Sequence, residues 1–374
     1  MLMSMPSIHE PANREAPRQN ASALHEVSAI PTRHRSNLAS NDALCYESPR
    51  MQFDFHGHLW TVAPWLLHLV RPAAAPPSSP FSTRIEDPQI GPIRLHGRIR
   101  HAPGSKSLFV AVHGLGGNVE SHYVLAAARA ADEAGLSCLR INLRGAGGGA
   151  VDFYHAGLWS DLHAALKAPE LDRYERITIL GYSLGGHVSL RYAASGSVDP
   201  RVRAIAAVCP PLDLDFGASE IDKPERWVYR RHLLEGLKEM YADVATRRPV
   251  PVPIREAQAI RTLREWDSRV VAARHGFRSA EHYYAEESAA PRLRQITVPS
   301  LLVATEGDPM VPAHTLRPAL QNAPENLDVK WLKRGGHVGF PQGVLVNEGT
   351  TPTPPSPSPP KSLERQVIDW LSAR

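Results

Sequence analysis

The stretch "RITILGYSLGGHVSL", residues 176–190, places a serine between glycines where two sequence patterns meet. Its first five residues form a short, β-branched apolar run typical of a buried strand. The part from residue 184 onward favours a helix. Ser183 lies between the two patterns, flanked by Gly181 and Gly185, which is the G-x-S-x-G arrangement of a nucleophile elbow. The pattern predicts a sharp turn that holds the Ser183 hydroxyl at the edge of a sheet.

Strand-like and helix-like segments alternate on both sides of this turn. This alternation predicts an α/β fold with a mostly parallel sheet and helices on both faces. The expected strands are residues 93–99, 108–112, 136–143, 176–180, 202–209, 298–305 and 328–332, and the expected helices are 123–135, 155–168, 184–195 and 363–373.

The alternation is interrupted between about residues 215 and 295, where segments such as 225–244 favour helices. We expect this insertion to form a cap over the carboxyl ends of the strands, the edge where open α/β sheets bind ligands. The proline-rich run "TTPTPPSPSPP" cannot hold a helix or a central strand. The resulting domain prediction is a disordered tail at 1–50, a hydrolase-like domain at 51–345, a proline-rich spacer at 346–361, and a last helix of the same domain at 362–374.

A serine hydroxyl needs a general base to become a good nucleophile, and the base needs an orienting acid. Asp308 lies in "EGDPMVP" directly after the strand at 298–305, and His337 lies in "RGGHVGF" after the next strand. The chain order serine, acid, histidine matches the order that follows a nucleophile elbow. The sequence therefore predicts a catalytic triad of Ser183, Asp308 and His337 at one edge of the sheet. Asp213 and Asp215, which also follow a strand, are alternative acids, and Glu306 is a weaker one.

An oxyanion hole is the remaining requirement for acyl transfer. One donor is expected to be the backbone N–H of Leu184, directly after the nucleophile, and the second that of Leu115 in "HGLGG". We interpret His113, in the same loop, and His187, in the helix after Ser183, as structural residues.

A rival motif, "GAGGGA" at residues 145–150, matches a dinucleotide-binding fingerprint and follows a predicted strand. The next helix begins several residues later, so we interpret the motif as a flexible loop near the active-site edge. We expect no cofactor and no metal, because no phosphate-binding loop of the GKS or GKT type and no metal-binding histidine pair is found.

Composition narrows the choice of partners and of compartment. The 374 residues carry 42 lysines and arginines against 38 acidic residues, a net charge of +4, which does not indicate a nucleic-acid partner. The cysteines, Cys45, Cys138 and Cys209, are few and widely spaced, and no signal-peptide pattern opens the chain, so a cytoplasmic location is expected. The apolar segment 59–70 is too short to span a bilayer. We expect it to pack against the body, with peripheral membrane contact as the alternative.

Several motifs together resemble the α/β-hydrolase superfamily, and more closely its YheT-like branch of predicted esterases. The resemblance covers residues 52–345 and includes "GHLWTVAP", "HGLGG", "NLRGAGG", "GYSLGG", "HGFRSAEHYY", "DPMVP" and "GGHVGF" in that order. It implies the triad roles of Ser183, Asp308 and His337. In the segment "EGDP", Gly307 replaces an acid that the branch often has.

The resulting functional prediction is a carboxylic ester hydrolase that works through an acyl-enzyme. The substrate is expected to be a small amphipathic ester of short to medium acyl chain, connected with lipid metabolism, because the cap is rich in aromatic and apolar side chains. Packing within the cap would explain such side chains equally well. The residues concerned are Trp227, Tyr229, Leu233, Leu234, Tyr283 and Tyr284. An acyltransferase with the same triad and a non-catalytic binding protein of the same fold remain as alternatives.

Overall fold

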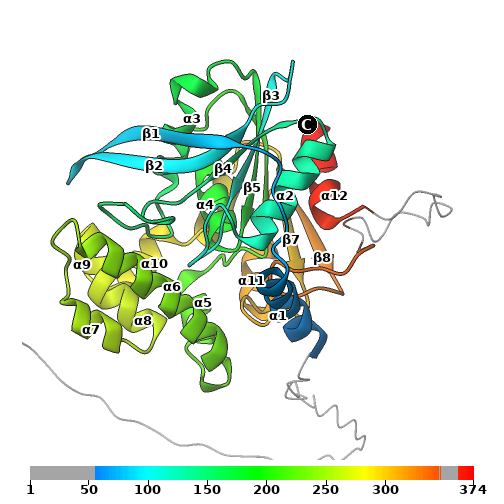
Figure 1. Cartoon of the computed structure of the whole chain (residues 1–374). Helices are drawn as coiled ribbons and strands as arrows, with labels where there is room; N and C mark the ends of the chain where they lie inside the picture. The colour runs from blue at the N-terminus through cyan, green and yellow to red at the C-terminus, as the bar shows by residue number, and fades with distance from the viewer. Residues whose placement is uncertain (1–54, 345, 347–360) are drawn as a thin grey trace, which may run out of the picture. The chain divides into compact units, whose positions relative to one another are not determined.

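An eight-stranded sheet with the order β1-β2-β4-β3-β5-β6-β7-β8 forms the centre of the unit that spans Phe53–Arg374 (Figure 1). The computed structural model describes residues 55–344, 346 and 361–374. The expected tail at 1–50 and nearly all of the expected spacer at 346–361 lie outside the described residues.

Six strands of the sheet, from β4 to β8 in spatial order, are parallel, so their carboxyl ends share one edge. β1 and β2 form an antiparallel hairpin beside β4. β1 was not expected from the sequence, because only Phe81 and Ile85 of its nine residues are buried. The strands are β1 (Ser79–Asp87), β2 (Gly91–Arg100), β3 (Ser107–Val112), β4 (Ser137–Ile141), β5 (Arg176–Tyr182), β6 (Val202–Val208), β7 (Ser300–Thr305) and β8 (Leu327–Leu332).

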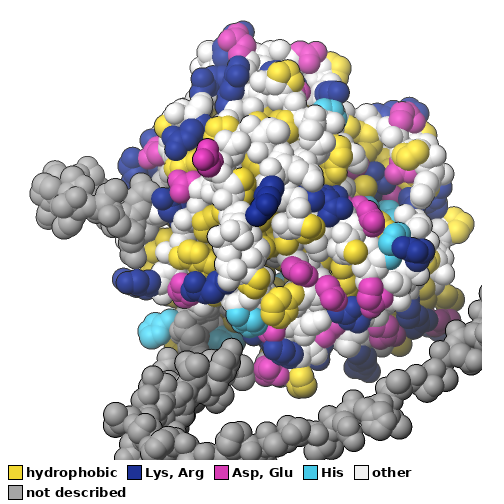
Figure 2. Space-filling model, turned by 180° about the vertical axis from the view of Figure 1, so that it is seen from behind, with side chains coloured by type: hydrophobic (Ala, Val, Ile, Leu, Met, Phe, Trp, Pro, Cys, Tyr) yellow, Lys and Arg dark blue, Asp and Glu magenta, His cyan; other side chains and the backbone are white. Residues whose placement is uncertain are grey.

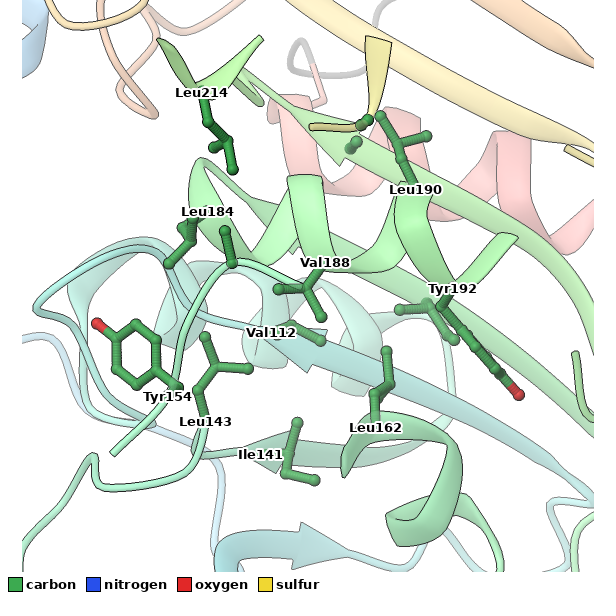
Figure 3. Close-up of a cluster of buried hydrophobic side chains, with 14 of the residues drawn as sticks. Val112, Ile141, Leu143, Tyr154, Leu162, Leu184, Val188, Leu190, Tyr192 and Leu214 are labelled. Carbon is green, nitrogen blue, oxygen red and sulfur yellow. The ribbon is translucent and has the colours of Figure 1, made fainter. Parts of the chain in front are cut away.

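Helices cover both faces of the sheet, as expected. On one face Leu162 and Val188 pack toward Val112 of the sheet (Figure 3). On the other face Val124 and Val367 belong to a second apolar cluster, and their two helices also contact each other. The helices of the first face are α3 (Trp159–Leu166), α4 (Leu184–Ala193) and α11 (Ala313–Leu320), and those of the second are α2 (His122–Glu133) and α12 (Leu363–Ser372). A short helix, η1 (Pro169–Leu171), follows α3.

A group of helices lies between β6 and β7 in the chain and gathers beside the sheet in Figure 1. Arg274 of this group bonds Asp152 of the main domain, and Glu287 bonds Arg191 of α4. These partly buried ion pairs connect the helices to the body. They are α5 (Leu214–Ile221), η2 (Pro224–Arg226), α6 (Trp227–Ala245), α7 (Ile254–Ala259), α8 (Leu263–Trp266), the π-helix η3 (Asp267–Ala272), α9 (Ala273–His275), α10 (Ala280–Glu287) and η4 (Ala290–Gln295).

The apolar segment 59–70 belongs to a helix, α1 (Phe55–Val70), and the expectation that it packs against the body is wrong for most of its large side chains. Gly57 is the one buried residue of the helix. Leu67 is 64% exposed and Val70 is 86% exposed. The helix contacts the body through Gly57, through Thr61 and through His58, which bonds Tyr229. Most of its large apolar side chains face outward.

The glycine-rich loop after β4 is held by ion pairs and does not open a helix. Arg144, just before it, is buried and bonds the carboxylates of Asp87, Asp152 and Asp161 at 2.6 to 2.8 Å. The next α-helix, α3, begins only at Trp159. A dinucleotide fingerprint requires the glycines to lead directly into a helix, and this loop lacks that arrangement.

Candidate active site

Ser183 occupies a strained turn between β5 and α4. Its φ of 49° and ψ of −120° lie in a region that L-residues rarely adopt. The Ser183 N–H donates to the carbonyl of Val208 at 2.8 Å, which ties the turn to β6. A Cβ on Gly181 would lie 2.2 Å from the Gly185 carbonyl oxygen, and a Cβ on Gly185 would lie 2.3 Å from that of His113. The glycines are therefore required by close backbone contacts.

Gly185→Ala is expected to destabilise the fold by about 3 kcal/mol, at the upper end of overpacking costs, since backbone atoms must move to admit the methyl group. Activity should fall with it, because the same shift displaces Ser183. Gly217→Ala in α5 is the matched control, since its new Cβ would meet only the Pro211 Cβ at 3.8 Å. Thermal unfolding of both variants tests this, and equal melting temperatures would contradict it.

His337 and Asp308 extend a hydrogen-bonded chain from Ser183. The His337 Nε2 lies 2.9 Å from the Ser183 Oγ, and its Nδ1 lies 2.9 Å from the Asp308 Oδ2. The other carboxylate oxygen of Asp308 accepts the backbone N–H groups of Met310 and Val311 at 2.8 and 2.9 Å. Both Asp308 and His337 are buried, while Ser183 is half-buried at the other end of this hydrogen-bonded chain.

The alternative acids are engaged elsewhere. Asp213 caps α5 by accepting the Phe216 N–H at 2.9 Å. Asp215 bonds Arg264, and Glu306 bonds Arg317 at 2.6 Å. Among the residues described, Asp308 is the acid that contacts the His337 ring.

The two expected oxyanion donors lie beside Ser183. Leu115 and Leu184 both line a cavity that also contains the Ser183 and His337 side chains. No hydrogen-bond acceptor within the described part of the chain is recorded for either backbone N–H. For Leu184 this follows from its place as the first residue of α4, because the first N–H groups of a helix have no acceptor within it.

His113 and His187 are buried away from the hydrogen-bonded chain. The His113 Nε2 accepts the Leu143 N–H at 3.0 Å, and burial lowers the pKa of His113 to about 4. The ring nitrogens of His187 contact the carbonyls of Pro211 and Glu287 at 2.8 Å, and burial lowers its pKa to about 4 as well. Both contacts are those of structural residues.

Helix α1 supports the histidine loop, a contact that sequence reasoning missed. The Thr61 Oγ1 accepts the His337 N–H at 2.8 Å. A Cβ on Gly336 would lie 2.3 Å from the Gly57 carbonyl oxygen, so α1 and the loop meet backbone to backbone. The segment "GHLWTVAP", which includes Thr61, is part of the family resemblance. That resemblance was the one indication in the sequence that α1 belongs to the site.

Two cavities meet at Ser183 and His337. The inner cavity lies beneath the cap helices, has a volume of about 110 Å³ and is mostly apolar. The outer cavity, of about 410 Å³, is lined by α1, α6 and the loop after β3, including Trp65, His122 and Tyr229. Of the aromatic and apolar cap residues named above, Leu233, Tyr283 and Tyr284 line the inner cavity, Leu233 and Tyr229 line the outer one, Leu234 is buried in the core and Trp227 is exposed.

Cys209 is the third member of a group with Asp308 and His337, since one potential ligand atom from each lies within 4.8 Å of the others. In the described ranges this is the group that could hold a metal ion. The His337 Nδ1 and the Asp308 Oδ2 already bond each other directly, and a structural zinc site would use four ligands. We therefore assign these atoms to the hydrogen-bonded chain, and the absence of a metal stays a prediction.

The strand order and the sharp turn at Ser183 are those of an α/β-hydrolase fold, and the hydrogen-bonded chain makes Ser183 the candidate nucleophile. Residues 109–348 match the profile of the alpha/beta hydrolase family, and the chain belongs to that family. The predicted fold class and family are thus confirmed.

Among its relatives, the protein named "Putative esterase YheT" of Escherichia coli (strain K12) is 30% identical over 273 residues, which are 71% of this chain and 77% of that protein. "Phospholipase ABHD3" of Homo sapiens is 24% identical, over 63% of this chain and 59% of its own length. The solved Pyrococcus furiosus esterase PF2001 aligns with a TM-score of 0.45 at 16% identity, covering 70% of this chain and 84% of that one.

Proposed function

We propose that the protein is a carboxylic ester hydrolase with Ser183 as nucleophile, His337 as general base and Asp308 as orienting acid. The observation that carries the proposal is the continuous hydrogen-bonded chain from the Ser183 Oγ through both ring nitrogens of His337 to Asp308. The esterase and lipase names of the relatives support it. A hydrolase is the class of enzyme to which the family points.

In the proposed mechanism, the Ser183 Oγ attacks the ester carbonyl while the His337 Nε2 accepts its proton. The backbone N–H groups of Leu115 and Leu184 stabilise the oxyanion, and each such donor contributes about 3 to 4 kcal/mol in comparable sites. His337 then protonates the leaving alcohol. Water, activated by His337, releases the acid and restores Ser183.

Labelling with a fluorophosphonate tests this function. The probe phosphonylates a serine only when the oxygen is activated, so we expect the adduct on Ser183 and no adduct in Ser183→Ala. Equal labelling of the two proteins, or no labelling of the wild type, would contradict the proposal. Product analysis with added alcohols separates hydrolysis from acyl transfer, the main alternative. Absence of any turnover would favour the non-catalytic alternative.

We further propose that the substrate is an amphipathic ester of short to medium acyl chain, drawn from a lipid surface. Between α1 and α6 lies an entrance surface, defined by the exposed side chains of Leu59, Trp65, Leu66, Leu67, Leu69, Val70, Trp227 and Val228. The two helices contact each other through His58 and Tyr229, whose ring nitrogen and hydroxyl lie 2.6 Å apart. Trp65 and Val228 also line the outer cavity, so this surface continues to Ser183.

Charge around the entrance surface favours an anionic lipid surface as its occupant. Segments 55–71 and 223–232 contain five arginines and lysines and one acidic residue, Glu225. Three of these cations form ion pairs with Glu220 or Glu235, which leaves Arg71 and Arg230 without an ion pair among the described residues. An apolar helix face bordered by basic and tryptophan side chains suits the interface of an anionic bilayer. Figure 2, which shows the molecule from behind the view of Figure 1, shows charges of both signs interspersed over that face. In the part of the chain that the structure describes, no helix has both the length and the hydropathy to cross a bilayer. The cytoplasmic location also stays a prediction.

Changing Leu67 and Val70 to glutamine together should lower the fraction bound to anionic vesicles at least tenfold, because two apolar side chains no longer enter the lipid, at about 1.5 kcal/mol each. Hydrolysis of a dissolved, monomeric ester should not change, since neither residue lines a cavity. Ile254→Gln, an exposed apolar position on α7, is the control. Vesicle co-sedimentation measures the effect, and equal binding by all three proteins would exclude the entrance surface as the contact.

A further inference from the structure

One carboxyl group lines the inner cavity. Asp267 opens the π-helix η3 and is the acidic residue among the cavity's described lining. Its neighbours there are apolar or aromatic, including Trp266, Val271 and Tyr283. π-Helical turns are frequent at functional sites, and this one places an acid at the wall of a mostly apolar cavity.

Asp267 has a single recorded partner. The Tyr284 hydroxyl donates to the Asp267 Oδ2 at 2.7 Å, and no cationic side chain in the described ranges is recorded within ion-pair distance of Asp267. Burial raises the pKa of Asp267 to about 7, with a further increase from Asp222, against the opposing effects of the Tyr284 hydrogen bond and Arg264. The carboxyl group therefore has one oxygen with no recorded protein partner.

The buried acids Asp152 and Asp161 differ from Asp267, because both have cationic partners. Asp152 and Asp161 both bond Arg144, and Asp152 also bonds Arg274. Asp267 is half-buried and faces a mostly apolar cavity, where a carboxyl group without a cationic partner is costly unless a ligand or a proton compensates it. The Tyr154 and Tyr283 hydroxyls of the same cavity already accept backbone N–H groups, from Gly116 and Ala156. Asp267 therefore keeps a carboxylate oxygen without a protein hydrogen-bond partner at the wall of this cavity.

We propose that Asp267 is a specificity residue that binds a hydroxyl group on the arm of the ester occupying the inner cavity. This inference rests on the proposed function and adds a substrate class to it, esters of hydroxylated chains. A hydroxyl is the group that suits this position, because it donates to an ionised carboxylate and accepts from a protonated one. An ammonium group would pair only with the ionised form, and a ketone only with the protonated form.

The test compares esters that differ only by a hydroxyl, placed at successive carbons of the chain, with the unsubstituted ester of equal length. The wild type should prefer one hydroxylated isomer by about 10- to 100-fold in kcat/KM, the range of one hydrogen bond to a charged group. Asp267→Leu should abolish that preference, so that the hydroxylated and unsubstituted esters are hydrolysed with similar kcat/KM. Equal preference in the wild type and Asp267→Leu, or none in the wild type, overturns the proposal.

Tyr284→Phe is the matched control for a purely structural role of Asp267. It removes the Tyr284–Asp267 hydrogen bond but leaves the carboxyl group in the cavity wall, so the hydroxyl preference should persist. If Asp267 only ties η3 to α10, the two variants should lose stability alike and leave the preference unchanged.

A binding measurement separates this proposal from the proposed function. Calorimetry with Ser183→Ala and the hydroxylated carboxylic acids needs no turnover, and it also replaces the kinetic test if Asp267→Leu hydrolyses nothing. Tighter binding of one hydroxy acid, weakened at least tenfold by adding Asp267→Asn or Asp267→Leu, supports the subsite even if no ester is hydrolysed. Ester hydrolysis with equal binding of all the acids, and with equal binding of the matching alcohols with and without a second hydroxyl, would support the function and refute the subsite.

Discussion

Ser183→Ala is expected to lower kcat for ester hydrolysis by about 10⁵- to 10⁶-fold, the loss found when the nucleophile of a serine triad is removed. Alanine has no atom that can form the acyl-enzyme, and the His337 Nε2 loses its 2.9 Å contact with the Ser183 Oγ. The remaining rate would come from substrate binding and the oxyanion donors alone. Stopped assays with an activated ester measure this difference, with product formed by contaminating esterases subtracted.

The fold should survive this change, which keeps the interpretation simple. Ser183 keeps its backbone bond to Val208, and alanine is as small as serine at the crowded elbow. Ser195→Ala, just after α4, is the matched control, since the Ser195 hydroxyl bonds only the local backbone. Its kcat should equal that of the wild type. A Ser183→Ala enzyme with more than a hundredth of the wild-type rate, at an unchanged melting temperature, would refute Ser183 as the nucleophile.

The sheet and the positions of Ser183, Asp308 and His337 at its edge were predictable because they depend on local patterns. Each residue lies within five residues of the end of a predicted strand. Parallel strands bring their carboxyl ends to one edge whatever the length of chain between them. The strained backbone at Ser183 follows from the same local geometry. Cys209 and Val338, the other non-glycine residues with positive φ in the described ranges, also lie next to this edge.

Contacts between distant segments were not predictable. Thr61 supports His337 across 276 residues of sequence, and nothing in the threonine's neighbourhood indicates that contact. The apolar pattern of α1 gives no indication of which side faces outward, because glycine at position 57 carries the contact with the body. The role proposed for Asp267 likewise depends on its position at the inner cavity. In the sequence it is only one charged residue within a helical stretch.

Asp308→Asn should reduce kcat/KM by about 10⁴-fold, although it changes one atom of the side chain. The Asp308 Oδ1 accepts two backbone N–H groups, from Met310 and Val311, so the asparagine must place its own oxygen there. The His337 Nδ1, whose N–H donates a hydrogen bond to the Asp308 carboxylate in the wild type, then faces the NH₂ group of the asparagine. That contact favours the tautomer with the proton on Nε2, and this nitrogen can no longer accept the Ser183 proton.

The alternative acids supply the controls for this prediction. Asp213→Asn should have full activity, because asparagine caps a helix as well as aspartate does. Asp215→Asn and Glu306→Gln remove only exposed ion pairs, worth about 0 to 1 kcal/mol of stability. The steady-state kinetics of all four variants, with a melting curve for each, decide the assignment. A loss of activity confined to Asp213→Asn or Asp215→Asn would identify an acid after β6 as the partner of His337. A loss of activity confined to Asp308→Asn would identify Asp308, which lies after β7. In that variant the fixed orientation of the new amide group accounts for the changed tautomer of His337.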